Sequence, residues 1–299
     1  MGRGLDYIMD YHQGRLKLGI PYGEEELNKH WLFKRNLTIV LGIAGAGKTS
    51  LLHYMQLVAS LLTGKKCISW TAENSPAGIQ LELMSALLGT NMKNIAADKV
   101  EGVFNLLAQY VEFVDTEVAT NMYDVIEAFK RKSLDDYQSI IIDPFSALKI
   151  DYKRMNKRRL SEYRYHYESI TDLRAFQKEC GKAIFLCVHP STGKARNKHP
   201  DGHKYAGMTM PLSSSDAENG SMFDNRADDY VVAHRYKQHP EDYKYTELHV
   251  LKVKELLTGG QETSMDYPLK FYKDRETHRW YINGVDILQK AIDKAKIRE

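Results

Sequence analysis

The feature that most constrains the fold is a glycine-rich stretch, Gly42-Ile43-Ala44-Gly45-Ala46-Gly47-Lys48-Thr49. It has the spacing G-x-x-x-x-G-K-[ST], in which small residues let successive backbone N–H groups approach the oxygens of a phosphate. An apolar run, residues 37–41, precedes it, and an apolar run of helical period, residues 51–62, follows it. Strand, loop and helix therefore occur in the order that places a helix N-terminus against a phosphate. The stretch predicts an α/β domain that binds a nucleoside triphosphate.

The chemistry of this loop assigns roles to its residues. We expect Lys48 to reach the β- and γ-phosphates and the Thr49 hydroxyl to hold Mg²⁺. The other positions expected to line the nucleotide are Gly42, Ala44, Gly45, Ala46, Gly47 and Ser50. A chance glycine-rich turn is the alternative, and the flanking strand and helix argue against it. The predicted ligands are ATP and Mg²⁺.

Three further predicted strands end in polar side chains. Glu73 follows the strand at residues 67–71, Asp143 ends the strand at 139–143, and His189 follows the strand at 183–188. The carboxyl ends of parallel strands face the ligand crevice of an open α/β sheet, so these side chains are expected beside the nucleotide. A carboxylate that ends a buried strand has the form of a Walker B element, which would meet Mg²⁺ next to Thr49.

Glu73 and His189 each have two interpretations. Glu73 would act as the general base for the water that attacks the γ-phosphate, or it would favour the start of the helix predicted from Pro76. We favour catalysis. His189 would hydrogen-bond the γ-phosphate as a sensor, or it would be a satisfied structural histidine, and its position in the sequence leaves both open.

Two segments are rich in basic residues. Residues 149–166 carry lysines and arginines with interleaved tyrosines, and residues 191–218 form a long polar loop after the third of these strands. Charge runs usually form solvated faces, but Lys and Arg with aromatic neighbours also suit a phosphate backbone and stacked bases. The predicted DNA contacts are Lys153, Arg154, Lys157, Arg158, Arg159, Lys194, Arg196, Lys198 and Lys204.

A predicted strand at residues 246–254 carries Lys252 and Lys254. Alternation along a strand places these two on one face, about 7 Å apart. The two lysines would lie on the solvated face of an edge strand, or they would reach the γ-phosphate held by an adjacent subunit.

The other predicted elements complete an α/β alternation. They are helices at 76–88, 122–134 and 216–227, a polar linker between the helix at 76–88 and a strand at 111–114, strands at 230–235, 269–273 and 280–282, and a charged C-terminal helix.

The whole chain limits the class of protein. Its 299 residues with 43% hydrophobic composition allow a sizeable core, and the net charge of +3 leaves attraction to nucleic acid to local clusters. The three cysteines form neither a CxxC pair nor an even set, which indicates buried thiols in a reducing compartment. We found neither a signal peptide nor an apolar run long enough to span a membrane, so a cytoplasmic location is expected.

The N-terminal residues, 1–18, are predicted to form a linker helix ahead of a single domain, 19–299. Its apolar residues include Leu5, Ile8 and Met9. A helix this short needs something to pack on. That partner would be its own domain or a neighbouring subunit.

The order of the motifs resembles the RecA-like ATPase core of the DnaB and Twinkle type of hexameric replicative helicase. The matching segments are Gly19-Ile20-Pro21 with Leu27-Asn28, Trp70-Thr71-Ala72-Glu73-Asn74-Ser75, Ile142-Asp143-Pro144-Phe145, Val188-His189-Pro190, and Gly220-Ser221-Met222-Phe223 with Asn225, Ala227 and Asp228. The last of these is similar to bacteriophage members. The resemblance implies a P-loop NTPase core with a mostly parallel sheet, flanking helices and antiparallel C-terminal strands.

The resemblance also implies roles for the site. Glu73 would be the catalytic base, His189 the phosphate sensor, and Lys48, Thr49 and Asp143 the phosphate and metal ligands. The two basic segments would line the central channel of a homo-hexamer or other ring on single-stranded DNA, in a bacterial or phage-infected cell. A primase or loader would be a separate protein.

One departure from the family keeps other functions open. The family usually has Lys-x-Arg where this chain has Lys252-x-Lys254, and a Lys-x-Lys pair is similar to RecA recombinases. Lysine lacks the bidentate fork of arginine and positions a phosphate less strictly. The alternatives are a recombinase or strand-annealing filament, and a regulatory ATPase such as a helicase loader.

Overall fold

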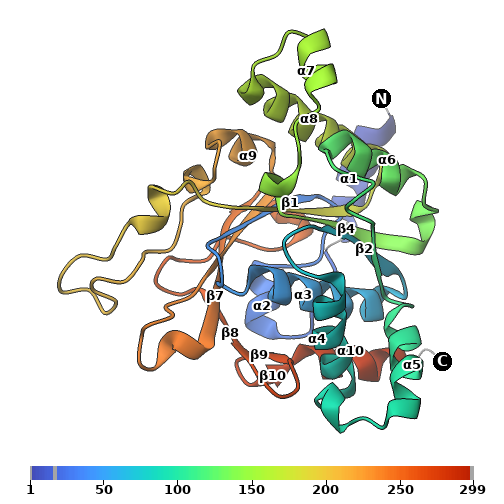
Figure 1. Cartoon of the computed structure of the whole chain (residues 1–299), viewed down its shortest axis with the longest axis vertical. Helices are drawn as coiled ribbons and strands as arrows, with labels where there is room; N and C mark the ends of the chain where they lie inside the picture. Colours follow the sequence, from blue (N-terminus) through green and yellow to red (C-terminus); the bar gives the residue numbers. More distant parts are fainter. Residues whose placement is uncertain (1, 16–18, 297–299) are drawn as a thin grey trace.

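The computed structural model describes residues 2–15 and 19–296, and within them one sheet of 10 strands has the order β10-β9-β8-β7-β6-β1-β5-β4-β2-β3 (Figure 1). The strands are β1 Leu37–Gly42, β2 Lys66–Thr71, β3 Val111–Phe113, β4 Tyr137–Asp143, β5 Ala183–Val188, β6 Asp229–His234, β7 Tyr245–Val253, β8 Leu269–Lys273, β9 Trp280–Ile282 and β10 Val285–Asp286. The strands from β3 to β6 in this order pair in parallel, and those from β6 to β10 pair antiparallel. The predicted fold class, a mostly parallel α/β sheet with antiparallel C-terminal strands, is confirmed.

Helices cover both faces of the sheet. They are α1 Gly2–His12, α2 Glu25–His30, α3 Lys48–Thr63, α4 Pro76–Leu88, α5 Ala97–Leu107, α6 Met122–Lys130, α7 Tyr152–Lys157, α8 Glu162–Cys180, α9 Ser221–Arg226 and α10 Ile287–Lys296. One core lies between the sheet and α3, α4 and α10, and a second lies between the sheet and α6, α8 and α9. Because both faces are covered, β1, β4 and β5 are buried along their whole length, which explains their continuous apolar sequences.

Three predicted elements are corrected by the structure. The supposed polar linker contains α5, which packs against α4. The helix predicted at residues 216–227 is present only as α9, because Asn219 and Gly220 both have a positive φ, 67° in each case, which a right-handed helix does not accept. The helix predicted at 122–134 ends at Lys130, and a short 3₁₀ turn, Leu134–Asp136, follows it.

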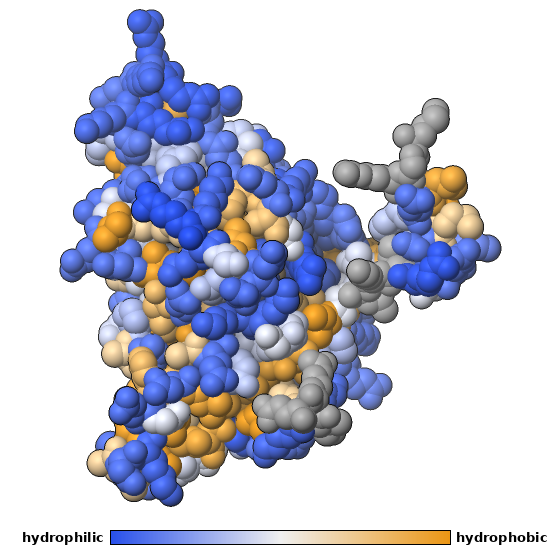
Figure 2. All heavy atoms as spheres, turned by 90° about the vertical axis from the view of Figure 1, so that its right-hand side faces the viewer, coloured by the Kyte–Doolittle hydropathy of each residue, from blue (hydrophilic) through white to orange (hydrophobic). Residues whose placement is uncertain are grey.

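The N-terminal helix forms as predicted but does not bury its apolar side chains. Leu5 and Ile8 are 62% and 61% exposed, and Figure 2 shows α1 standing away from the body of the molecule. The last predicted linker residues, 16–18, lie outside the described residues. Packing of α1 on its own domain is therefore not observed, and packing on a neighbouring subunit stays a prediction.

In the part of the chain that the structure describes, no helix has both the length and the apolar character needed to cross a bilayer. The cytoplasmic location stays a prediction.

Candidate active site at the carboxyl edge of the sheet

The loop between β1 and α3 has the form that the glycine-rich sequence predicts. Gly45 and Gly47 have φ of 72° and 92°, a conformation that favours glycine. At Gly47 a side chain would also collide with the C-terminal strands, because its Cβ would lie 2.7 Å from Thr246 Oγ1. α3 begins immediately afterwards at Lys48, so its unpaired N–H groups face the loop. We call residues 42–49 the P-loop.

Three polar side chains meet at the base of the P-loop. The Thr49 hydroxyl donates a hydrogen bond of 2.5 Å to Asp143 Oδ2, and Lys48 Nζ lies 3.8 Å from Asp143 Oδ1. Lys48 also donates to the carbonyl oxygen of Val188 at 3.5 Å. The structure thus brings together Lys48, the predicted phosphate-binding lysine, with Thr49 and Asp143, the predicted metal ligands.

The surroundings of Asp143 fit a divalent cation. The residue is fully buried, and its Oδ1 atom has no hydrogen-bond donor among the described residues. Lys48, at 3.8 Å, supplies one positive charge, and a buried carboxylate oxygen that accepts no hydrogen bond is free to bind a metal ion as well. One carboxylate and one hydroxyl, with phosphate and water oxygens for the remaining positions, are the ligands that Mg²⁺ prefers beside a nucleotide. Burial raises the pKa of the adjacent Cys187 thiol, and the negative charge of Asp143 raises it further, so this thiol stays protonated.

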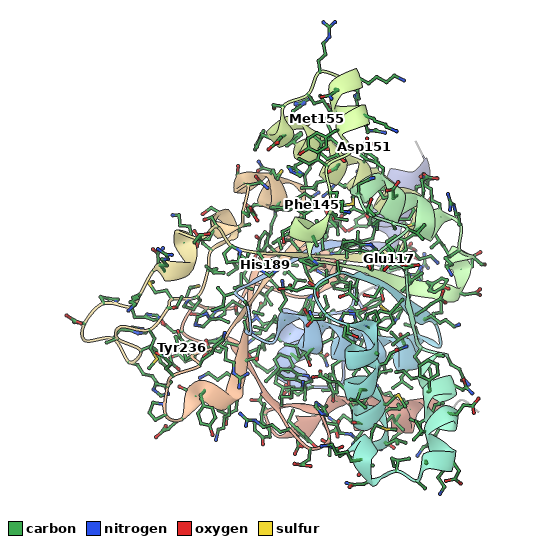
Figure 3. The ribbon with its side chains drawn as sticks, in the orientation of Figure 1. Glu117, Phe145, Asp151, Met155, His189 and Tyr236 are labelled. Atoms are coloured by element: carbon green, nitrogen blue, oxygen red, sulfur yellow. The ribbon has the colours of Figure 1, made fainter. Side chains whose placement is uncertain are left out.

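Glu73 and His189 face each other across the mouth of this site. His189 Nε2 lies 3.2 Å from Glu73 Oε2, although the two residues come from the ends of β2 and β5. Both line a cavity of about 200 Å³ together with Lys48, Thr49 and other P-loop residues. Figure 3 labels His189 at the end of its strand. α4 begins at Pro76, and its N-cap residue, Ser75, makes no side-chain capping hydrogen bond. Both interpretations of Glu73 stay predictions.

The first basic segment is partly occupied by structural ion pairs. Arg158 pairs with Glu168 at 2.7 Å, and Arg154 lies 3.4 Å from Asp172 with its guanidinium over the Tyr123 ring. Among the predicted DNA contacts of this segment, the exposed residues that make no ion pair with a described residue are Lys153, Lys157 and Arg159. They lie on and just after α7, which projects from the body (Figure 1).

The second basic segment, the loop at residues 191–218, is folded back on itself. Lys198 pairs with Thr209 and His199 with Ala206 through backbone bridges. Lys194 lies 3.8 Å from Asp216, whereas Arg196 and Lys198 are exposed and make no ion pair with a described residue. Lys204 forms an ion pair of 3.1 Å with Asp242. This loop and α7 project in different directions, so the structure does not bring the two predicted DNA-binding segments together within one chain (Figure 1).

Lys252 and Lys254 lie at the opposite edge of the sheet from the P-loop. β7 is antiparallel to β6, and Val253 pairs with Asp229, the first residue of β6. Lys252 Nζ donates to the carbonyl oxygen of Asp224 at 2.5 Å, and Lys254 Nζ lies 3.2 Å from Asp228 Oδ1. Neither lysine can reach the nucleotide site of its own chain. A cavity of about 790 Å³ at this edge is lined by Lys254 and by Lys34, Arg35 and Lys178.

The chain from the end of β6 onward adds contacts to the P-loop and to the first turn of α3 that the sequence did not predict. Lys237 Nζ donates to the carbonyl oxygen of Ala44 at 2.5 Å, and Lys273 Nζ donates to Ser50 Oγ at 2.8 Å. In the sequence Lys237 is marked only by its position just after the apolar run of β6. This position implies a contact with the P-loop only because β6 pairs with β1.

Comparisons with known proteins bear on the fold of this chain. No family model matches the sequence, and no curated protein matches it. The ATPase domain of a phage helicase matches the structure with a TM-score of 0.69 and 14% sequence identity, covering 93% of this chain and 96% of that one. A DnaB-like replicative helicase, described with its interactions with primase, matches with a TM-score of 0.69 and 13% identity, covering 94% of this chain and 68% of that one.

This chain has the RecA-like fold of helicase ATPase domains. The resemblance expected from the motifs is therefore confirmed at the level of the fold, and at these identities the likeness establishes the fold alone.

Proposed function

We propose that this RecA-like domain is the ATPase motor of a ring-forming DNA helicase of the DnaB type. The observation that carries the proposal is the convergence of Glu73 and His189 on the cavity lined by Lys48 and Thr49. The Thr49 hydroxyl is in turn hydrogen-bonded to the buried Asp143. A structural glycine-rich turn would have no need of a carboxylate and an imidazole at its mouth. A triphosphatase needs both a phosphate cradle and a group that activates water.

The hydrolytic step follows from the positions of these side chains. Lys48 and the backbone N–H groups of the P-loop hold the β- and γ-phosphates, and Glu73 takes a proton from the attacking water. His189, at 3.2 Å from Glu73, orients this carboxylate and contacts the γ-phosphate. Mg²⁺, held by Thr49 and Asp143, would neutralise charge on the phosphate oxygens.

Assembly into a ring is supported by two exposed features. Lys252 and Lys254 lie at the edge of the sheet opposite the P-loop, where they would contact the nucleotide of an adjacent subunit. α1 exposes the apolar side chains Leu5 and Ile8, which a neighbouring copy would cover. A homo-hexamer buries both features.

Single-stranded DNA is the proposed track. The exposed cations of α7 and of the loop at 191–218 project from separate parts of one chain and would come together around the channel of a ring. A separate primase or loader is a further proposed partner, since the similar DnaB-like structure is described with primase.

The test combines unwinding and assembly. The purified chain with ATP and Mg²⁺ is expected to separate a forked DNA duplex and to form closed rings in electron microscopy. Helical filaments that bind DNA without unwinding it would instead favour a recombinase, the function to which the Lys252-x-Lys254 pair is similar. If the chain forms no rings and no filaments and does not unwind the duplex, a regulatory ATPase would be favoured.

A further inference from the structure

The outer side of the P-loop is contacted by a lysine of the same chain. Lys237 Nζ donates to the Ala44 carbonyl oxygen at 2.5 Å, and a Cβ added to Gly45 would lie only 2.6 Å from this ammonium. The P-loop therefore has a cation on each side. Lys48 lies at its base, and Lys237 lies on its outer surface.

Sheet order accounts for the position of Lys237. β6 runs parallel to β1, with Ala233 paired to Gly42, so both strands reach the carboxyl edge side by side. The chain that leaves β6 at His234 must then pass the P-loop. A backbone turn from the carbonyl of Arg235 to the N–H of Lys237 directs the lysine towards Ala44.

A basic cavity adjoins this contact. It has a volume of about 240 Å³, and the P-loop residue Ile43 lines both this cavity and the nucleotide cavity. Its lining includes Lys198, Arg235 and Lys237 and contains no carboxylate. None of these three cations forms an ion pair with a described residue. A concave surface with this charge favours an anion.

Tyr236, the neighbour of Lys237, is held by the loop at residues 191–218. The Tyr205 ring from that loop stacks on Tyr236 with centroids 3.6 Å apart and an interplanar angle of 18°. His199 Nε2 and the Tyr236 hydroxyl are 2.9 Å apart, and the Tyr205 hydroxyl donates to Asp242 Oδ2 at 2.7 Å. Both tyrosines are buried. Figure 3 shows Tyr236 at the base of this loop.

Charge further fixes the Tyr205–Tyr236 stack. Burial opposes ionisation of Asp242, but hydrogen bonds from Tyr205 and Lys204 outweigh it and lower the pKa of this carboxyl. Asp242 therefore stays ionised and anchors Tyr205. Tyr236 and Lys237 are consecutive, so the stack determines where the Lys237 stem begins.

We propose that Lys237 is a second phosphate-binding lysine of the nucleotide site, acting within its own chain, and that the Tyr205–Tyr236 stack positions it. The proposal rests on the proposed ATPase function. A lysine ammonium gains more from a phosphate oxygen than from the Ala44 carbonyl, because charge-assisted hydrogen bonds are the stronger kind, and its flexible stem allows the exchange. Nucleotide binding and the position of the loop at 191–218 are then coupled in both directions.

The first experiment measures the affinity of a fluorescent, non-hydrolysable ATP analogue. Lys237→Gln is expected to weaken binding about 10-fold, the effect of losing one hydrogen bond to a charged group, and Lys237→Arg is expected to keep most of the affinity. The loss should be smaller for the matching nucleoside monophosphate. Lys290→Gln is the matched control, since Lys290 donates to the Gly23 carbonyl at 2.9 Å on another surface and should bind the analogue normally.

The outcomes separate this inference from the function on which it rests. If the unaltered chain fails to bind the analogue, the ATPase function fails. If the unaltered chain binds it and Lys48→Ala abolishes binding, but Lys237→Gln changes the affinity less than twofold, the inference alone is overturned.

The second experiment tests the positioning role of Tyr205. Tyr205→Ala removes both the stack and the hydrogen bond to Asp242 and is expected to weaken binding about threefold. Tyr205→Phe keeps the stacked ring, loses only the hydrogen bond, and should lose less affinity than Tyr205→Ala. In the Lys237→Gln background Tyr205→Ala should have no further effect, because it acts through Lys237. An equal loss in both backgrounds, or no loss in either, would overturn the positioning role. Unfolding midpoints of each variant report any general loss of folding.

Discussion

The buried pair of Lys48 and Asp143 gives the sharpest energetic prediction. Their charged atoms are 3.8 Å apart, and their side chains are 5% and 0% exposed. At an effective dielectric constant of 20, the Coulomb attraction at this distance is about 4 kcal/mol. Asp143→Asn removes one charge and leaves Lys48 buried with the Val188 carbonyl as its remaining partner. Removing one partner of a buried pair costs about 3–5 kcal/mol, and we expect about 3 kcal/mol because Val188 still accepts a hydrogen bond.

A double-mutant cycle measures this coupling. Lys48→Met leaves Asp143 buried without its cation and should also lower the free energy of unfolding by about 3 kcal/mol. The double variant should lose about 3 kcal/mol and not the sum of about 6, because no charge is left unpaired. Urea unfolding of the chain without nucleotide, followed by circular dichroism, gives all the values. A double variant that loses the full sum would refute the argument that these charges stabilise each other.

Three further predictions concern catalysis, pH and DNA. Glu73→Gln should lower the rate of ATP hydrolysis at least about 100-fold and change analogue affinity less than about threefold, and equal losses in both assays would contradict a role as general base. Burial lowers the pKa of His234 from 6.5 to about 4, so its neutral form stabilises the fold by about 3 kcal/mol above pH 6.5. That contribution should disappear as the pH falls from 6.5 to about 4. In His234→Phe the free energy of unfolding should therefore decrease less over this pH range than in the unaltered chain. An equal decrease in both would show that other groups cause the loss of stability. Replacing Lys194, Arg196 and Lys198 with Gln should reduce the slope of log affinity for single-stranded DNA against log salt by about 2, and an unchanged slope would remove this loop from the DNA contact.

The sequence predicted those parts of the site whose signals are local. The P-loop, Asp143 and His189 each follow or end an apolar run that is buried on both faces. The apolar run predicts a strand, and the end of that strand predicts where the side chain lies. Parallel pairing then brings all of these strand ends to one edge, which is why residues far apart in the chain meet in one cavity.

The parts that were missed depend on pairing between distant strands. Alternation correctly placed Lys252 on a strand, whereas Lys254 lies just past the end of β7 at Val253. Only the antiparallel pairing of β7 with β6 shows that both lysines lie at the edge opposite the P-loop. Lys237 was overlooked because its meaning depends on β6 lying beside β1. α5 was missed because it buries only Leu107, so its apolar residues do not form the fully buried face that marks a core helix.

We propose that this P-loop hydrolyses ATP in response to DNA, and the steady-state hydrolysis rate with and without single-stranded DNA measures that response. We expect Mg²⁺-dependent hydrolysis that increases several-fold with single-stranded DNA and is abolished in Lys48→Ala. A rate that is the same with and without DNA, or one that survives in Lys48→Ala, would contradict it.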